Sequence, residues 1–349
     1  MPALACTAER AKAYARNARA ATTHRAYARD WRDFAAFCAQ VGFDALPAPP
    51  QAVAHYITAL AGIKAVATIR RRLVAIAQMH KLQGFASPTS DPIVREILAG
   101  IERTHGVAPR RKSALTVELL KDILHRLDPG LKGIRDRALL LLTFAGGFRR
   151  SEVAALDLAD VRFETRGAVV TLRRSKTDQR GVGREVAIPQ LRTATLCPVQ
   201  ALQAWLAAAA ITEGALFRTF SMRGALQPHR IDGRDIARLV QRLARRAHLD
   251  GDFGAHSLRA GFITSGAMRG VAEVSLQAVT GHRSTTILRV APLYCCKKAE
   301  TTADFRKSFS NTKTFTERNQ QWPNSSLPYP RAHFQRSPKI SSHGSSRAI

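Results

Sequence analysis

The chain has 349 residues, of which 45% are hydrophobic, so it is long and apolar enough to bury two domain cores, and disorder throughout is excluded. Its 54 lysine and arginine residues against 26 acidic residues give a formal net charge of +28, which requires an acidic partner. The excess charge runs along the whole chain instead of lying beside one apolar anchor, and this distribution favours nucleic acid over a membrane surface.

The first hundred residues are predicted to form a helical bundle. Large apolar residues recur there at spacings of three and four, which places them on one face of each helix. Helices are expected over residues 23–40, 52–60, 68–82 and 93–102. In the third helix Arg70, Arg71 and Arg72 lie around the surface that the apolar face leaves free, so this surface is expected to be basic and to bind DNA.

A linker is predicted after the bundle. Residues 104–115 have no apolar period, contain Gly106 and Pro109, and include three consecutive cations. These cations, Arg110, Arg111 and Lys112, are expected to contact phosphate.

The rest of the chain is predicted to form a second, mainly helical domain with a small β-hairpin, which makes the fold class mainly α with a little β (α+β). Helices are expected from residue 116 to the Pro129–Gly130 stop and over residues 132–144, 198–210, 232–247, 256–268 and 272–279. Between them the period changes to two over residues 168–173 and 184–188, which predicts a hairpin with a polar turn. The aperiodic residues 306–349 are expected to be a disordered basic tail.

Neither a membrane span nor a disulfide framework is expected. The longest uncharged apolar stretches, 138–148 and 197–212, are shorter than the roughly 20 residues that cross a bilayer. The five cysteines show no C-x-x-C spacing and are interpreted as reduced thiols. The protein is therefore expected to be soluble and intracellular.

Several cationic residues stand at helix ends and turns of the second domain. Arg149 and Arg150 follow an apolar helix, and the spacing of three between His256 and Arg259 puts both on one helical face. A lysine in the hairpin turn and a histidine after a helix-ending glycine complete the set: Lys176 and His282. Arginine and lysine do not ligate metals at neutral pH, so no metal site is predicted, whereas this set suits a phosphodiester.

Taken one at a time, these residues have simpler interpretations. Arg149 is equally typical of a charge near a helix C-terminus, and His282 of a capping residue. Lys176 is equally typical of a solvated turn residue, and Arg173 and Arg174 compete with it for any role at the phosphate. The ordered set of motifs favours the functional interpretation.

That ordered set resembles the tyrosine recombinases of the phage integrase family, over about residues 1–290. The family's boxes occur in order as Gly147-Phe148-Arg149-Arg150-Ser151-Glu152, Lys176 in the β-turn, His256-Ser257-Leu258-Arg259 and Gly281-His282. The resemblance implies a helical, SAM-like core-binding domain (1–103), a basic linker (104–115), a catalytic domain (116–305) and the tail (306–349). The two domains would clamp duplex DNA.

The resemblance also implies an activity, site-specific cleavage and rejoining of DNA through a 3′-phosphotyrosyl intermediate, and a role for each matching residue. Arg149 and Arg259 would bind the scissile phosphate, with Arg150 contacting DNA beside them. Lys176 would be the general acid, while His256 and His282 would assist proton transfer. No cofactor or nucleotide is implied. A homo-tetramer on two DNA sites is expected, in the cytoplasm of a prokaryotic cell and associated with the nucleoid.

The nucleophile departs from the family pattern. The family tyrosine usually lies about nine residues after the Gly-His histidine, where this chain has Ala291; the nearest tyrosine is Tyr294. Two interpretations stay open. Tyr294 is a displaced nucleophile, or the nucleophile is lost and the chain is a DNA-binding remnant of an integrase. RNA binding is disfavoured because the aromatic strand motif of an RNA-recognition domain is absent.

Overall fold

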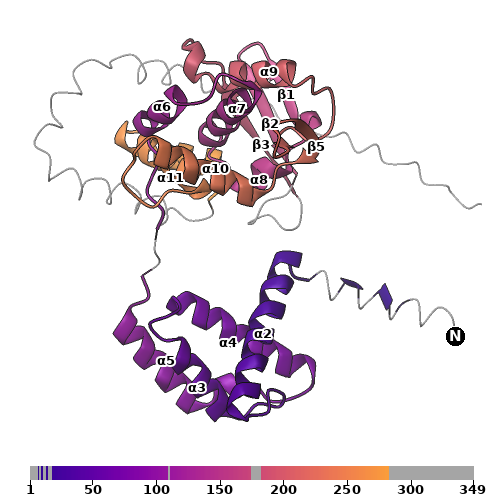
Figure 1. Cartoon of the computed structure of the whole chain (residues 1–349), viewed down its shortest axis with the longest axis vertical. Helices are drawn as coiled ribbons and strands as arrows, with labels where there is room; N and C mark the ends of the chain where they lie inside the picture. Colours follow the sequence, from indigo (N-terminus) through magenta and orange to yellow (C-terminus); the bar gives the residue numbers. More distant parts are fainter. Residues whose placement is uncertain are drawn as a thin grey trace, which may run out of the picture.

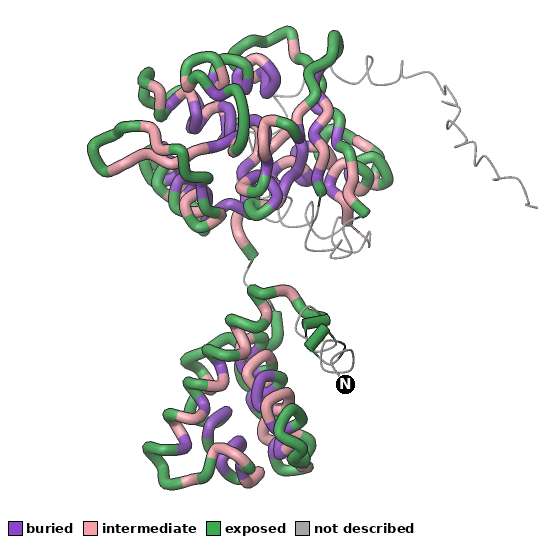
Figure 2. The backbone as a smooth tube through the Cα atoms, turned by 90° about the vertical axis from the view of Figure 1, so that its right-hand side faces the viewer, coloured by how far each residue is buried: buried purple, intermediate pink, exposed green. Residues whose placement is uncertain are grey.

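The computed structural model describes residues 18–108, 111–173 and 182–282, together with residues 7, 9, 10, 13 and 14. Within this part of the chain the structure is mostly helical with two small antiparallel sheets, which confirms the predicted fold class. Figure 1 shows two bodies, one before and one after the segment that follows His105, and the buried residues lie inside each of them (Figure 2).

The N-terminal body is a helical bundle. Its helices are α2 (Ala21–Val41), α3 (Pro50–Leu60), α4 (Val66–Leu82) and α5 (Pro92–His105), with a 3-10 turn η1 (Pro88–Ser90) before the last. Prolines at the first position open α3 and α5, where a missing N–H costs nothing. The predicted apolar faces form the core, with Phe34, Ile57, Ile69 and Ile76 fully buried. The helix bounds agree with the predicted ranges to within a few residues.

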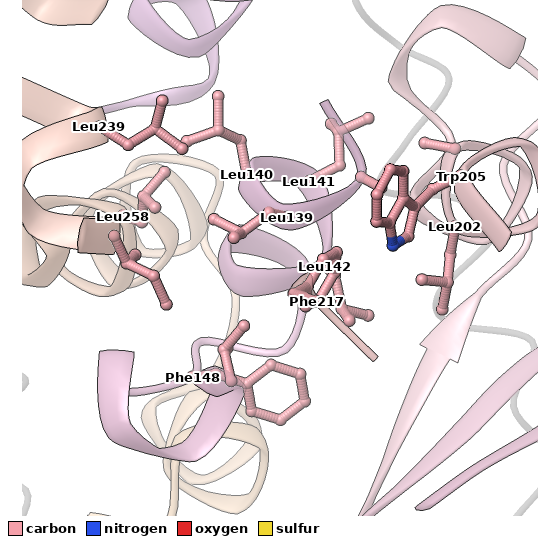
Figure 3. Packing of buried hydrophobic residues seen from close by; sticks show 14 of the residues in the cluster. Leu139, Leu140, Leu141, Leu142, Phe148, Leu202, Trp205, Phe217, Leu239 and Leu258 are labelled. Atoms are coloured by element: carbon pink, nitrogen blue, oxygen red, sulfur yellow. The ribbon is translucent and has the colours of Figure 1, made fainter. Parts of the chain in front are cut away.

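The second body contains α6 (Val117–His125), α7 (Leu131–Ala145), α8 (Arg150–Ala155), α9 (Pro198–Ala208), α10 (Gly233–Arg246), α11 (Ala255–Met268) and α12 (Glu273–Thr280), with 3-10 turns η2 (Leu158–Asp160) and η3 (Ala194–Leu196). The centre of its core is α7, in which Leu139, Leu140, Leu141 and Leu142 are all buried. Leucines facing every direction fit a helix surrounded by protein. Figure 3 shows them between Trp205 of α9 and Leu258 of α11.

The larger sheet has the order β1 (Val161–Glu164), β2 (Gly167–Leu172), β3 (Arg184–Pro189), all antiparallel. The register pairs Val170 with Val186 and Leu172 with Arg184. Alternate residues of β2 and β3 are buried, so one face of the sheet covers the core. The smaller sheet joins β4 (Arg218–Phe220) to β5 (Leu226–Arg230).

Besides the 3-10 turns, four short elements were not predicted: α8, β1, β4 and β5. Each is six residues or shorter, and β5 contains Pro228, which removes a ladder donor and argues against a strand. The end of the expected linker lies against the second body. Leu115 is fully buried in the second core and its N–H donates to the Ser257 carbonyl at 2.9 Å, because an apolar residue beside α11 gains more from burial than from solvent.

Candidate active site

The turn after α7 sets the position of Arg149. Gly147 has φ +54°, a left-handed conformation that favours glycine, and Phe148 behind it is fully buried. This anchored turn places Arg149 at the N-cap of α8. Arg149 is therefore at the start of the next helix, so the alternative of a C-terminal helix charge does not apply.

Glu152 orients Arg149 through two contacts. Its carboxylate accepts the Arg149 backbone N–H at 2.8 Å and pairs with the Arg149 guanidinium at 2.7 Å. The Glu152 side chain is 1% exposed and that of Arg149 is 17% exposed. A buried carboxylate that binds both ends of one arginine restricts its rotamers, and the remaining guanidinium donors stay available to a ligand.

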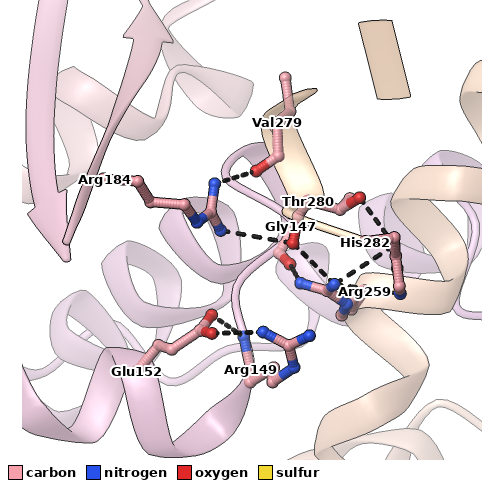
Figure 4. Close-up of polar contacts among 8 residues, drawn as sticks. All are labelled: Gly147, Arg149, Glu152, Arg184, Arg259, Val279, Thr280 and His282. Carbon is pink, nitrogen blue, oxygen red and sulfur yellow. Dashed lines mark hydrogen bonds and ion pairs between the residues drawn. The ribbon is translucent and has the colours of Figure 1, made fainter. Parts of the chain in front are cut away.

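Arg259 lies in the middle of the site. This α11 residue is 1% exposed and its guanidinium donates to the Gly147 carbonyl at 2.5 Å and to the Thr280 carbonyl at 2.7 Å (Figure 4). Its Nε has no hydrogen-bond partner among the described residues. No carboxylate in the described part of the chain pairs with it either. The groups that Arg259 does contact are neutral, so its buried positive charge is not compensated by another described side chain.

The end of α12 brings His282 to Arg259. Gly281 ends the helix in the left-handed conformation, φ +65°, with its N–H donating to the Gln277 carbonyl at 2.7 Å. His282 follows, and its Nε2 lies 3.0 Å from Arg259 Nη2. The Gln277 side chain donates to the His282 carbonyl at 2.7 Å and fixes the backbone of the histidine.

Arg184 is a site residue that the sequence did not reveal as one. It begins β3, and its guanidinium donates to the carbonyls of Val279 at 2.6 Å and Thr280 at 3.4 Å. These contacts tie the sheet to the last turn of α12 (Figure 4). A signal was present in the pattern: Arg184, Val186 and Ile188 alternate on one strand face, and a cation in line with two core residues is directed toward the protein.

Burial and like charges shift the pKa values of this cluster. Desolvation, and next the charge of Arg149, lower the pKa of Arg259 from 12.5 to about 9, so its guanidinium is still charged at neutral pH. Desolvation is also the main cause that lowers the pKa of Arg184. Burial, and then the charges of Arg259 and Arg149, lower the pKa of His282 from 6.5 to about 4, and its ring is neutral at neutral pH.

Three guanidinium groups, those of Arg149, Arg184 and Arg259, therefore lie in one largely buried cluster, in which Glu152 beside Arg149 supplies the carboxylate (Figure 4). An excess of buried positive charge is costly without an anion, so the arrangement is that of an anion site. Planar guanidinium forks match the oxygens of a phosphodiester. No group of three or more histidine, cysteine or acidic residues that could hold a metal occurs in the described ranges.

The structure brings together three of the residues predicted as catalytic, Arg149, Arg259 and His282. His256 lies one turn before Arg259 on α11, is exposed, and is close enough to His282 to help lower its pKa. Lys176 and Tyr294, predicted as the general acid and the nucleophile, lie outside the described residues, as do Arg110 and Arg174.

The predicted DNA-binding arginines of α4 make ion pairs inside the bundle. Arg70 pairs with Glu102 at 2.6 Å, Arg71 with the buried Asp30 at 2.6 Å, and Arg72 with Asp33. Their side chains are 55%, 38% and 11% exposed, so Arg72 is not the surface residue that the helical pattern predicted. It is covered because it also bonds the Tyr56 hydroxyl, at 2.5 Å.

The other predicted DNA contacts that belong to the described residues lie at the surface of the second body or at its edge. Arg111 and Arg150 are exposed, and Arg173 is 61% exposed while pairing with Asp160 at 2.6 Å. Lys112 pairs with Asp252, which holds the end of the linker against the second body. All of them keep donors accessible from solvent.

Comparison with known proteins places this fold and site in a family. The phage integrase family profile matches residues 113–290. An integrase/recombinase xerD homolog of Selenomonas ruminantium is 36% identical over 280 residues, 79% of this chain and 82% of the relative. The tyrosine recombinase XerC of Pelotomaculum thermopropionicum is 32% identical over 154 residues, 43% of this chain and 46% of the relative. The chain belongs to the phage integrase family of tyrosine recombinases.

The fold is also similar to that of a solved recombinase. The crystal structure of the XerH site-specific recombinase in a post-cleavage complex with its palindromic difH substrate aligns with a TM-score of 0.53 and 19% identity, covering 74% of this chain and 73% of that one. In the described residues of our protein, no helix is both long and apolar enough to cross a membrane.

Proposed function

We propose that this protein is a site-specific recombinase that cleaves and rejoins duplex DNA through a 3′-phosphotyrosyl intermediate. The observation that carries the proposal is the state of Arg259: its guanidinium is fully buried, and among the described residues its Nε has no acceptor and no carboxylate pairs with it. A scissile phosphate would supply the missing negative charge and acceptors. Family membership supports the same activity.

Each residue of the proposed mechanism has a distinct task. Arg149 and Arg259 bind the non-bridging oxygens and stabilise the charge that builds in the transition state. Tyr294 attacks the phosphorus, and Lys176 protonates the departing 5′-oxygen. His282 and His256 assist proton transfer. Because the phosphotyrosyl bond conserves the energy of the broken phosphodiester, religation needs no nucleotide.

The N-terminal bundle and the second body are proposed to clamp the duplex, with the bundle over residues 1–103, the linker over 104–115 and the catalytic domain over 116–305. Arg70, Arg71, Arg111, Arg150 and Arg173 expose the donors that would contact phosphates. A homo-tetramer on two sites, in a bacterial cytoplasm, completes the proposal. The bacterial origin of both relatives supports this setting.

A second candidate rests on one observation, the alanine at position 291. If Tyr294 cannot reach the phosphate, the chain keeps the arginine cluster and is a DNA-binding remnant that does not cut. The two functions differ only in the formation of the covalent bond, so an assay for that bond decides between them.

The test is suicide-substrate trapping. The purified full chain is incubated with nicked duplexes from the DNA beside its own gene, and a covalent adduct is sought on a denaturing gel. We expect an adduct whose peptide mass maps to Tyr294 and which Tyr294→Phe abolishes while salt-sensitive DNA binding is retained. Arg259→Lys should also lose the adduct.

The contrary outcome is equally specific. Salt-sensitive binding without an adduct in the natural chain, together with an adduct in Ala291→Tyr, would establish the DNA-binding remnant and overturn the recombinase proposal. Tyr329→Phe, at a tyrosine further along the chain, is the matched control and should leave the adduct unchanged.

A further inference from the structure

Thr280 is fully buried at the point where three parts of the site meet. It is the last residue of α12, and its carbonyl accepts from Arg259 on α11 and Arg184 on β3. Its methyl group packs against Gly147: a Cβ added to that glycine would lie 2.8 Å from Thr280 Cγ2. The remaining group, the hydroxyl, is 2.8 Å from His282 Nδ1 and 2.7 Å from the Leu276 carbonyl.

The hydrogen bonds around His282 determine where its proton lies. A guanidinium only donates, so the ring nitrogen that faces Arg259 must accept. Arg259 Nη2 donates one hydrogen to the Thr280 carbonyl at 2.7 Å. Its other hydrogen is available to the His282 ring, whose Nε2 lies 3.0 Å from Nη2 and whose Nδ1 lies 3.3 Å from it. Nε2 is therefore the acceptor, and a neutral ring carries its hydrogen on Nδ1.

The Thr280 hydroxyl is arranged to receive that hydrogen. A carbonyl only accepts, so the hydroxyl uses its single hydrogen on the Leu276 carbonyl at 2.7 Å. Its lone pairs are then directed to Nδ1 at 2.8 Å. In this series of hydrogen bonds, His282 Nδ1–H donates to Thr280 Oγ1, and the Thr280 hydroxyl donates to the Leu276 carbonyl. If the Thr280 hydroxyl donated to Nδ1 instead, the Leu276 carbonyl would lose this hydrogen bond.

We propose that Thr280 is a positioning residue that holds the Nδ1 proton of His282, so that Nε2 is the ring nitrogen that keeps an acceptor lone pair at the phosphate site. The effect of Thr280 on catalysis rests on the proposed recombinase function, whereas the hydrogen bonds that fix the His282 tautomer do not. The groups that face the ring are Thr280 of α12, Arg259 and His256 of α11, Arg184 of β3 and Arg149 before α8. Thr280 is the one hydroxyl side chain among them.

The test reads the tautomer directly. Histidine-selective ¹⁵N labelling of the full chain without DNA gives two ring nitrogen resonances for His282, assigned by their loss in His282→Gln. In the wild type at pH 7 we expect the pattern of a neutral ring protonated on Nδ1. In Thr280→Val, which keeps the methyl group and replaces the hydroxyl with a second methyl, the two resonances should move toward each other or exchange positions as the Nε2-protonated form is populated.

Two further variants separate this role from simple packing. Thr280→Ser restores the hydroxyl without the methyl and should recover the wild-type tautomer. Thr264→Val is the matched control: Thr264 is a buried threonine of α11 whose hydroxyl has no partner among the described residues, so removing it should leave the His282 resonances unchanged. Melting temperatures of all variants verify that each one folds.

The functional consequence is measured on the same proteins by suicide-substrate trapping. Thr280→Val should form adduct roughly tenfold more slowly than the wild type, and Thr280→Ser should form it at nearly the wild-type rate. If Thr280→Val keeps the Nδ1-protonated pattern, Arg259 alone sets the tautomer and the inference is overturned. If the tautomer changes as expected but the wild type forms no adduct, the inference on Thr280 holds and the recombinase proposal fails.

Discussion

Arg259 donates a 2.5 Å hydrogen bond to the carbonyl of Gly147, a residue 112 positions earlier in the chain. This bond joins α11 to the turn that carries Arg149, so it links the two arginines of the proposed phosphate site. The same guanidinium also holds the end of α12 through the Thr280 carbonyl. Arg259 thus connects three segments of the site: its own helix α11, the turn at Gly147 and the end of α12.

An anion should therefore stabilise the protein through Arg259. Inorganic phosphate that occupies this site in the folded state, and not in the unfolded chain, should raise the wild-type melting temperature in a concentration-dependent way. Arg259→Lys, which replaces the fork by a point charge, should lose most of this increase. Arg162→Gln is the control, because Arg162 is 62% exposed on β1 and should affect only nonspecific anion binding. Equal phosphate effects in all three proteins would contradict the anion site.

Stability should depend on pH through His282. Its pKa is lowered from 6.5 in the unfolded chain to about 4 in the folded protein, so the unfolded chain binds more protons between these values. Stability should therefore rise with pH from about 4 to 6.5 and be lost as pH falls through the same range. Urea unfolding at several pH values measures this slope.

The matched comparison for this slope is His282→Gln, which cannot titrate. The variant should show a flatter pH dependence over that window, and the difference between the two curves isolates this one group. DNA or phosphate at the site should raise the pKa of His282 in the wild type, because the anion offsets the arginine charges. Parallel curves for the wild type and the variant would contradict the assignment.

Arg184 should hold the last turn of α12. Arg184→Gln removes its donors to the carbonyls of Val279 and Thr280, so amide hydrogen exchange should become faster at Gly281 and His282. Arg137→Gln is a matched control, since Arg137 bridges two other carbonyls, those of Leu124 and Thr195. If both variants leave exchange at the end of α12 unchanged, Arg184 has no positioning role.

The arginines of α4 should separate into two kinds. Arg70 is 55% exposed, so Arg70→Gln should weaken DNA binding uniformly and reduce the salt slope by about one. Arg72 is 11% exposed and bonds Asp33 and Tyr56, so Arg72→Gln should cost about 1–3 kcal/mol of unfolding free energy. Salt-dependent binding assays and urea unfolding measure the two effects. A loss of stability in Arg70→Gln with an unchanged salt slope would contradict its proposed contact.

The sequence predicted the long elements because their apolar periods are strong. Phe34, Ile57 and Ile76 are buried as their spacing requires, and each helix longer than eight residues was located to within a few residues. The short elements α8, β1, β4 and β5 were missed because their three to six residues show no clear apolar period. The second core also holds an ion pair between Arg135 and Asp136, 7% and 4% exposed, that no local pattern indicates.

The candidate site was predictable in part. Its motif arginines and His282 follow from ordered short boxes in the sequence. Arg184 and Thr280 could not be identified in the same way, because their roles arise from contacts between β3, α11 and α12 that only the tertiary structure creates. A threonine before a helix-ending glycine is ordinary in sequence, and its meaning depends on the histidine ring that lies 2.8 Å away.

The Gly147 turn provides the last prediction. Gly147→Ala meets two penalties: a left-handed φ of +54°, and a Cβ that would lie 2.8 Å from Thr280 Cγ2 and 3.2 Å from Phe262. Gly270→Ala meets the first penalty only, because Gly270 has φ +73° and no atom within 4 Å of an added Cβ. The control should therefore cost about 1 kcal/mol and Gly147→Ala at least about 2 kcal/mol of unfolding free energy.

The clash in Gly147→Ala should also affect activity. It pushes Thr280 away from the turn, so Gly147→Ala should slow adduct formation and disturb the His282 resonances, whereas Gly270→Ala should do neither. Urea unfolding and trapping on both variants give the comparison. Equal losses of stability in the two variants would mean that the turn relaxes to accommodate the added Cβ. The close contact between Gly147 and Thr280 would then not position the site residues.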